Sequence, residues 1–307
     1  MVTPHFLRIG DTIGIISTAR KITSLELKPL IDLIEAWGLK YILGSTINAE
    51  SNQYAGDDLT RIADFQEMLD NPKVKAIWCG RGGYGTVRII DHLNFSDFIK
   101  NPKWIIGYSD VTVLHSHIHN FGIETLHANM AIDIDTKTED TRRSIKTVLF
   151  GKDYKVTLAS KNKLNREGSA NGELVGGNLS ILSSLVGSPS ELITRGKILF
   201  LEDLDEMHYH IDRMMQCLKR SGALDNINGL VVGGMSDMRD NVIPFGKTAQ
   251  EIISDTVAEY NFPICFDFPC GHIHDNRAIL LGREIHLTVA KNKVTLTFNQ
   301  KKRPDTL

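Results

Sequence analysis

A chain of 307 residues exceeds the length of about 100–200 residues that one domain usually takes, so two domains are expected. A hydrophobic fraction of 42% with 23% charged residues is ordinary for a folded globular protein and excludes a largely disordered chain. A formal net charge of -2 lacks the basic excess of proteins that grip a phosphate backbone, so nucleic acid is excluded as an expected partner.

The first half of the chain alternates short apolar runs with amphipathic stretches. This alternation is typical of βαβ units around a parallel sheet. Ligands of such sheets bind at the carboxyl ends of the strands, so chemistry is expected in the loops after Trp78 and Ile106. We predict strands at 12–16, 41–43, 74–78 and 104–106, and helices at 25–37, 59–69, 86–93 and 111–120.

The loop after Trp78 is a glycine-rich run over 80–85. Several glycines before a helix let backbone N–H groups approach a phosphate or an oxyanion closely. The run has neither dinucleotide-binding nor P-loop spacing, which disfavours a nucleotide. A plain tight turn stays open as the alternative.

The loop after Ile106 reads Gly107-Tyr108-Ser109-Asp110. A serine between a strand and a helix is the geometry of a nucleophile elbow, in which Oγ is lifted above the sheet beside N–H groups that can receive an oxyanion. Serine and aspartate are also favoured helix N-caps, and the second glycine of the Gly-x-Ser-x-Gly pattern is missing. The tetrapeptide alone therefore leaves both interpretations open.

A polar stretch separates this half from the rest of the chain. We place an N-terminal domain at 1–135, a linker region at 136–171 with one short helix near 141–149, and a C-terminal domain at 172–307. The C-terminal region again mixes strands and helices, and it ends in a predicted hairpin over 285–297.

An acidic run over 202–206 follows the apolar strand predicted at 198–201. Glu202 lies at the predicted strand end, where a side chain can project into a cleft and orient a histidine. We interpret Asp205 and Glu206 as charges at the start of the next helix, where they stabilise the positive end of its dipole.

A fourth candidate for chemistry is the run Gly271-His272-Ile273-His274. A His-x-His pair could form half of a metal site, as in metal-dependent amidohydrolases. Its place near the end of the chain and the lack of a second pair or a lysine ligand argue against that interpretation. No metal site is predicted, and most of the histidines at 115, 117, 119, 208 and 210 are interpreted as ordinary surface or half-buried residues.

The cysteines Cys79, Cys217, Cys265 and Cys270 show neither a Cys-x-x-Cys pair nor metal-finger spacing, which indicates free thiols in a reducing compartment. The first ten residues carry no basic segment followed by an apolar run, and no stretch approaches the roughly 20 apolar residues that span a bilayer. We expect a cytoplasmic protein that does not enter a membrane.

Taken in order, these motifs resemble those of the LD-carboxypeptidases, a family of serine peptidases that includes muramoyltetrapeptide carboxypeptidases and microcin-immunity peptidases. The matching motifs span most of the chain. They are Arg81-Gly82-Gly83-Tyr84-Gly85, Gly107-Tyr108-Ser109-Asp110, Gly176-Gly177-Asn178-Leu179, Leu201-Glu202-Asp203, Asp212-Arg213 and Gly271-His272.

The resemblance implies that Ser109 is the nucleophile, His272 the general base and Glu202 the carboxylate that holds the imidazole. It also implies an oxyanion hole made by the main-chain N–H groups of Asp110 and of the Gly82-Gly83 turn. His274 has no role that the motif assigns.

We expect Arg81, Tyr108 and Asn178 to bind the substrate. A carboxypeptidase recognises a free carboxylate, and a guanidinium is its natural fork-shaped partner. Arg81 is the candidate nearest in sequence, with a purely structural role equally open. The loop over 17–20 lacks the Pro-Ser pair of many relatives, so the subsite that it forms is left open.

The resemblance further implies an α/β fold with an N-terminal parallel-sheet domain, flavodoxin-like and doubly wound, and a smaller β-rich α/β C-terminal domain. It implies a homodimer without a cofactor that removes terminal D-alanine from muropeptide tetrapeptide stems in peptidoglycan recycling. One alternative is a microcin-immunity-type peptidase acting on peptidyl or aminoacyl nucleotides. Another, from a different class, is a non-catalytic small-molecule binding protein.

Overall fold

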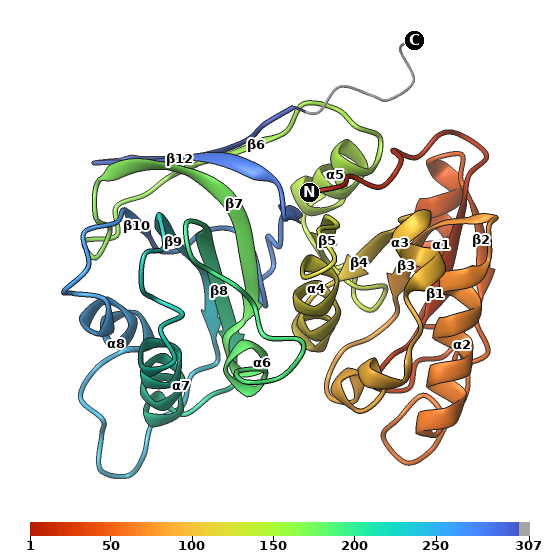
Figure 1. The fold of residues 1–307 in the computed structure, drawn as a ribbon, viewed down its shortest axis with the longest axis horizontal. Coiled ribbons are helices and arrows are strands. Elements are labelled where there is room, and N and C mark those ends of the chain that lie inside the picture. Colours follow the sequence, from red (N-terminus) through yellow and green to blue (C-terminus); the bar gives the residue numbers. More distant parts are fainter. Residues whose placement is uncertain (301–307) are drawn as a thin grey trace.

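The computed structural model describes residues 1–300, and its strands form two sheets that lie side by side (Figure 1). The first sheet has the strand order β11-β5-β4-β3-β1-β2, in which all pairs are parallel except β11 with β5. The order 2-1-3-4-5 of its parallel strands is the flavodoxin-like, doubly wound order, as predicted. The strands are β1 (Thr12–Ile16), β2 (Lys40–Leu43), β3 (Val74–Cys79), β4 (Trp104–Gly107), β5 (Thr125–His127) and β11 (Ile279–Leu281).

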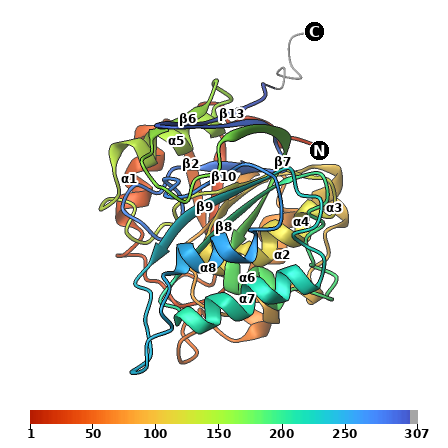
Figure 2. The ribbon, with the colours of Figure 1, turned by 90° about the vertical axis from the view of Figure 1, so that its left-hand side faces the viewer.

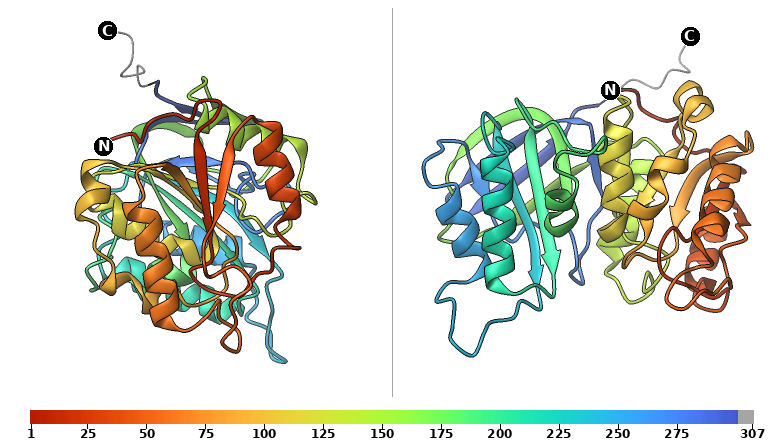
Figure 3. Two further views of the ribbon diagram at one scale, coloured as in Figure 1. Left: turned by 90° about the vertical axis from the view of Figure 1, so that its right-hand side faces the viewer. Right: turned by 60° about the horizontal axis from the view of Figure 1, so that its bottom comes forward.

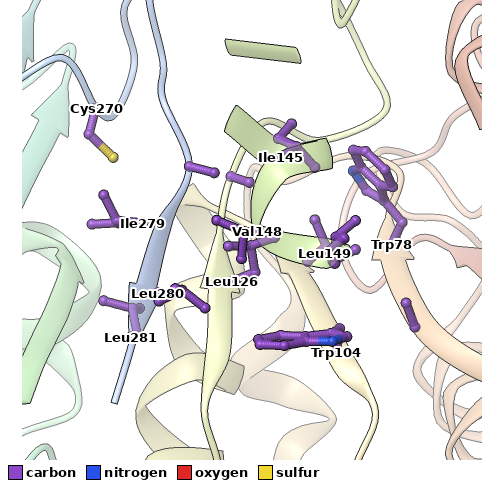
Figure 4. Packing of buried hydrophobic residues seen from close by; sticks show 14 of the residues in the cluster. Trp78, Trp104, Leu126, Ile145, Val148, Leu149, Cys270, Ile279, Leu280 and Leu281 are labelled. Atoms are coloured by element: carbon purple, nitrogen blue, oxygen red, sulfur yellow. The ribbon is translucent and has the colours of Figure 1, made fainter. Parts of the chain in front are cut away.

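Helices cover both faces of the first sheet because successive residues of each strand point to opposite sides. In β3, Trp78 joins the apolar cluster under α1 (Lys28–Ala36) and α5 (Glu139–Leu149), whereas Ile77 joins the cluster on the other face. That other face packs on α2 (Asp58–Asp70), α3 (Ser96–Lys100) and α4 (Thr112–His119). Figure 3 shows this domain from its outer side, and Figure 4 shows Ile145, Val148 and Leu149 of α5 packed among Trp78, Trp104 and Leu126.

The second sheet is mixed, with the order β10-β9-β8-β7-β12-β13-β6. Its long strand β7 pairs in parallel with β8 along one part and antiparallel with β12 along the other. Helices α6 (Leu179–Ser184), α7 (His208–Arg220) and α8 (Ala249–Thr256) cover one face (Figure 2). The strands are β6 (Lys155–Ala159), β7 (Gly168–Asn178), β8 (Ile198–Leu204), β9 (Gly229–Ser236), β10 (Ile264–Cys265), β12 (Glu284–Ala290) and β13 (Lys293–Phe298).

The segment 136–171, expected to be a linker, contributes to both sheets. Helix α5 packs on the first sheet, while β6 forms an edge of the second. Only Val156 of β6 is buried, so this short edge strand carries little of the burial pattern that marks a strand in a sequence. The C-terminal part also returns to the first domain through β11, which forms an edge of the first sheet.

Two further local predictions have different outcomes. The hairpin is confirmed, because β12 pairs antiparallel with β13 around a turn after Ala290. The helix predicted over 86–93 is instead two short 3₁₀ turns, Thr86–Arg88 and Ile90–His92. Its residues include several β-branched side chains, which disfavour a regular α-helix.

None of the helices within residues 1–300 combines the length and the apolar character needed to cross a membrane.

Candidate active site

Ser109 occupies a strained turn between β4 and α4. Its backbone φ of 62° lies in the left-handed region that non-glycine residues rarely adopt, at a cost of roughly 1–3 kcal/mol. Neither the 3₁₀ turn Ser109–Val111 nor α4 has a side-chain N-cap hydrogen bond. The geometry therefore favours the nucleophile elbow over the helix cap for this serine.

His272 and Glu202 form a hydrogen-bonded pair at the end of the second sheet. His272 Nδ1 lies 2.6 Å from Glu202 Oε2, and the His272 backbone N–H donates to the same oxygen at 3.2 Å. The Glu202 side chain is completely buried, and that of His272 is 12% exposed. Two donors on one carboxylate oxygen fix the position of the imidazole ring.

The pair shifts the pKa values of both partners. Burial raises the pKa of Glu202, but the charge and hydrogen bonds of His272 outweigh it and hold the pKa below its usual value. Burial lowers the pKa of His272, but the charge and hydrogen bond of Glu202 outweigh it and raise the pKa above its usual value. The histidine is thus a stronger base than an ordinary imidazole.

Glu202 lies within β8 rather than after it. The pairing of β8 with β9 changes register between Leu201 and Asp203, which places a β-bulge at Glu202. Bulges often occur beside active sites, where they redirect a side chain. Here the bulge presents the carboxylate to the loop that carries His272.

The interpretation of Asp205 and Glu206 as charges at the start of a helix was wrong. Helix α7 begins at His208 and has no acidic residue in its first turn. Asp205 instead pairs with Arg239 at 2.9 Å, and Glu206 pairs with His210 at 2.8 Å. The Asp205–Arg239 ion pair and the Glu206–His210 hydrogen bond replace the predicted interaction with the helix dipole.

Contacts between the two domains bring Ser109 towards the Glu202–His272 pair. The ring of Tyr108 lies 4.7 Å from the His272 ring, centroid to centroid. Thr112 Oγ1 accepts the backbone N–H of Asn178 at 3.1 Å. Ser109 Oγ has no hydrogen-bond partner among residues 1–300, and catalytic hydrogen bonds often tighten only when substrate binds.

The glycine-rich turn lies directly against the elbow. A Cβ built on Gly82 would be 3.3 Å from Ser109 Cβ. Asp110 Oδ2 accepts the backbone N–H of Thr86 at 2.9 Å, which ties the turn to the elbow. Within the described chain, the N–H groups of Gly82, Gly83 and Asp110 donate to no acceptor, so they are free to receive an oxyanion.

The three residues expected to bind substrate lie in different surroundings. Tyr108 is nearly buried and packs on the His272 ring. Arg81 is paired with Glu26 at 3.6 Å and donates to the Lys21 carbonyl at 3.4 Å. Asn178 caps α6 through Oδ1 and donates from Nδ2 to Asp203 at 2.9 Å, so both polar ends of its amide are already engaged. Their contact with substrate stays a prediction.

Sequence reasoning missed a buried histidine beside the pair. His127, at the end of β5, is completely buried, and its Nδ1 lies 3.3 Å from Cys270 Sγ. Its ring also packs on Tyr108 at 5.8 Å between centroids. The only signal in the sequence was its position at the end of a strand beside β4.

Sequence reasoning also placed Lys137 in a polar linker. In the structure its Nζ donates to the carbonyl of Ile273, the residue after His272, at 3.1 Å.

The histidines and cysteines form no metal-binding cluster within residues 1–300. His115 and His119 are buried, contrary to the expectation of surface or half-buried histidines. His115 Nε2 interacts with the Gly107 carbonyl at 2.9 Å and thereby supports the strand end before the elbow. All four cysteines are free.

Residues 13–128 match the family model of the LD-carboxypeptidase N-terminal domain, and residues 171–287 match that of the C-terminal domain. The chain belongs to the LD-carboxypeptidase family. It is therefore a carboxypeptidase of the serine type, and the binding protein without catalysis is set aside.

Several curated proteins are similar to this LD-carboxypeptidase. The chain is 35% identical to the Bacillus subtilis protein named "Probable murein peptide carboxypeptidase", over 95% of this chain and 93% of that protein. It is 26% identical to the murein tetrapeptide carboxypeptidase of Pseudomonas aeruginosa, over 90% and 92% of the two chains. It is 24% identical to the microcin C7 self-immunity protein of Escherichia coli, over 95% and 94%.

A solved structure of the family shares the two-domain fold. The muramoyltetrapeptide carboxypeptidase of Oxalobacter formigenes superposes with a TM-score of 0.85 at 26% identity, covering 94% of this chain and 99% of that one. The predicted fold class is thereby confirmed for this LD-carboxypeptidase.

Proposed function

We propose that this LD-carboxypeptidase hydrolyses the bond between the L-centre of a diamino acid and a terminal D-alanine in a muropeptide tetrapeptide stem, with Ser109, His272 and Glu202 as its catalytic residues. The observation that carries the proposal is the buried Glu202–His272 pair, 2.6 Å between Oε2 and Nδ1. The His272 ring packs on Tyr108, the residue before the strained Ser109. The murein peptide substrates named for two relatives support the choice of substrate.

The proposed reaction begins with attack of Ser109 Oγ on the carbonyl carbon of the scissile amide. His272 Nε2 accepts the hydroxyl proton, while Glu202 holds the Nδ1 proton and stabilises the imidazolium. The N–H groups of Gly82, Gly83 and Asp110 stabilise the tetrahedral oxyanion.

Collapse of this intermediate breaks the carbon–nitrogen bond, and His272 gives its proton to the leaving D-alanine. Water then attacks the acyl-enzyme, with His272 again accepting a proton, and the second tetrahedral intermediate releases the shortened peptide and regenerates Ser109. The raised pKa of His272 suits both roles, because the ring must accept and return a proton near neutral pH.

The test is incubation of the purified protein with a tetrapeptide stem ending in D-alanine, followed by mass analysis of the products. We expect release of D-alanine and no cleavage of the same peptide ending in L-alanine. Ser109→Ala and His272→Ala should each abolish release, and the double variant should be little worse than either, because triad residues act as a unit. Release that survives in Ser109→Ala would contradict the mechanism.

The same assay should be run in parallel with a second class of substrate. The similarity to the microcin C7 self-immunity protein favours an aminoacyl nucleotide as the competing substrate. Faster cleavage of such a nucleotide than of the tetrapeptide would reassign the substrate while leaving the catalytic residues in place.

We also propose a cytoplasmic homodimer that uses no cofactor. The free cysteines support a reducing compartment. The family resemblance supports the dimer, which sedimentation at several protein concentrations would test.

A further inference from the structure

A carboxypeptidase has to hold the terminal carboxylate of its substrate close to the reacting bond. In the proposed reaction, His272 gives its proton to the leaving nitrogen, so the leaving residue lies on the His272 side of Ser109. When one residue leaves, its carboxyl carbon is only two covalent bonds from that nitrogen, and the oxygens lie within roughly 3–4 Å of it. The group that binds this carboxylate must therefore lie beside His272.

Two arginines, Arg20 and Arg81, lie at the glycine-rich turn. Arg81 is paired with Glu26. The Cδ of Arg20 would be 2.5 Å from a Cβ on Gly83, which places this arginine against the oxyanion turn. Within residues 1–300, no hydrogen bond or ion pair joins either arginine to the loop that carries His272.

Lys137 lies on the required side. Its Nζ donates to the carbonyl of Ile273, the residue after His272, at 3.1 Å. Its charge acts on His272, where it lowers the pKa of the imidazole.

The Lys137 ammonium is half-buried and incompletely satisfied. It makes no ion pair within 4.0 Å with any carboxylate of residues 1–300. Burial lowers the pKa of Lys137, and the charge of Asp133 offsets only part of this effect. The carboxylate of Asp275 is engaged by Arg277 and Thr138. One of the three N–H donors of a lysine is used by Ile273, so two are left for a ligand. A partly desolvated ammonium is stabilised when an anion pairs with it.

We propose that Lys137 binds the terminal carboxylate of the substrate and so restricts this enzyme to the last residue of a peptide. The inference rests on the proposed function and adds a specificity-determining residue to it. An ammonium at this position would favour a free carboxylate over an amidated or extended C-terminus.

The experiment compares two substrates, the tetrapeptide stem with a free D-alanine carboxylate and the same stem ending in D-alaninamide. Wild-type enzyme should prefer the free acid. Lys137→Met, which keeps the length of the side chain and removes its charge, should lower kcat/KM for the acid by roughly 10- to 100-fold, as loss of a charge-assisted hydrogen bond does. The same variant should leave kcat/KM for the amide nearly unchanged, and Lys137→Arg should retain most of the preference.

Matched variants separate this role from general effects. Lys28→Met removes one positive charge from the exposed surface of α1 and should change neither substrate's rate. An equal loss for acid and amide in Lys137→Met would mean that Lys137 only holds the Ile273 carbonyl, and the proposal would be wrong. It would also be wrong if the preference for the acid disappeared in Arg20→Met or Arg81→Met while Lys137→Met kept it. Failure of wild-type enzyme to cleave the acid would overturn the proposed function itself, together with the subsite that depends on it.

Discussion

The backbone at Gly271 passes so close to Glu202 that a Cβ on the glycine would lie 2.7 Å from both Cβ and Oε2 of the glutamate. Gly271 also has a φ of 104°, a conformation that side-chain-bearing residues rarely adopt. This close approach lets the next residue, His272, donate both its backbone N–H and its ring N–H to one carboxylate oxygen. The glycine is thus a structural requirement of the pair.

Gly271→Ala should therefore damage both stability and catalysis. The added methyl group overpacks a filled site, at about 1–3 kcal/mol, and adds backbone strain. A shift of the imidazole by about 1 Å can cost roughly 100-fold in turnover. Urea unfolding and steady-state kinetics measure the two effects. Gly246→Ala is the control, because φ there is 85° but nothing lies within 4 Å of the added Cβ, so only the strain cost should appear.

The strained backbone of Ser109 predicts a difference between two inactive variants. Ser109→Gly should unfold with a free energy about 1 kcal/mol higher than Ser109→Ala, because glycine adopts a φ of 62° without the penalty that alanine retains. Both variants lack the nucleophile and should release no D-alanine. Equal stabilities in denaturant would show that this turn stores no strain.

Glu202→Gln should depress turnover strongly with little effect on substrate affinity. The amide can keep the geometry yet favour the wrong imidazole tautomer, which costs roughly 10⁴-fold in another triad. Asp205→Asn and Glu206→Gln are the controls, because their carboxylates pair with Arg239 and His210 rather than with His272. Steady-state kinetics on the three variants should show the large loss only at Glu202; the reverse order would assign the acid to another residue.

The fall of kcat/KM at acidic pH should reflect protonation of His272. The ring must be neutral to accept the Ser109 proton, so kcat/KM should fall as the pH drops through the raised pKa of His272, above the ordinary value of 6.5. In Glu202→Gln the charge that raises this pKa is gone while burial still lowers it, so the fall should move to lower pH. A fall that stays in place in the variant would assign it to a different group.

Hydrophobic periodicity in the sequence determined most of the individual elements. Strand β1 has the predicted bounds Thr12–Ile16, and the hairpin of β12 and β13 lies where alternation placed it. Alternation and period reflect which face of a local segment is buried, so they can be read from neighbouring residues alone. The ordered motifs, through their family resemblance, also supplied the candidates Ser109, Glu202 and His272.

The tertiary structure decided which distant residues meet. Glu202 and His272 are 70 positions apart, and they form a pair only because a bulge in β8 and the glycine before His272 bring them together. Strand β11 belongs to the C-terminal half of the chain but extends the first sheet. Lys137 lies in a polar segment of the sequence, and its Nζ donates to the Ile273 carbonyl. Such contacts depend on how whole elements pack across the domain boundary. Local composition carries no signal of that packing, because the same polar residues would suit a solvated loop equally well.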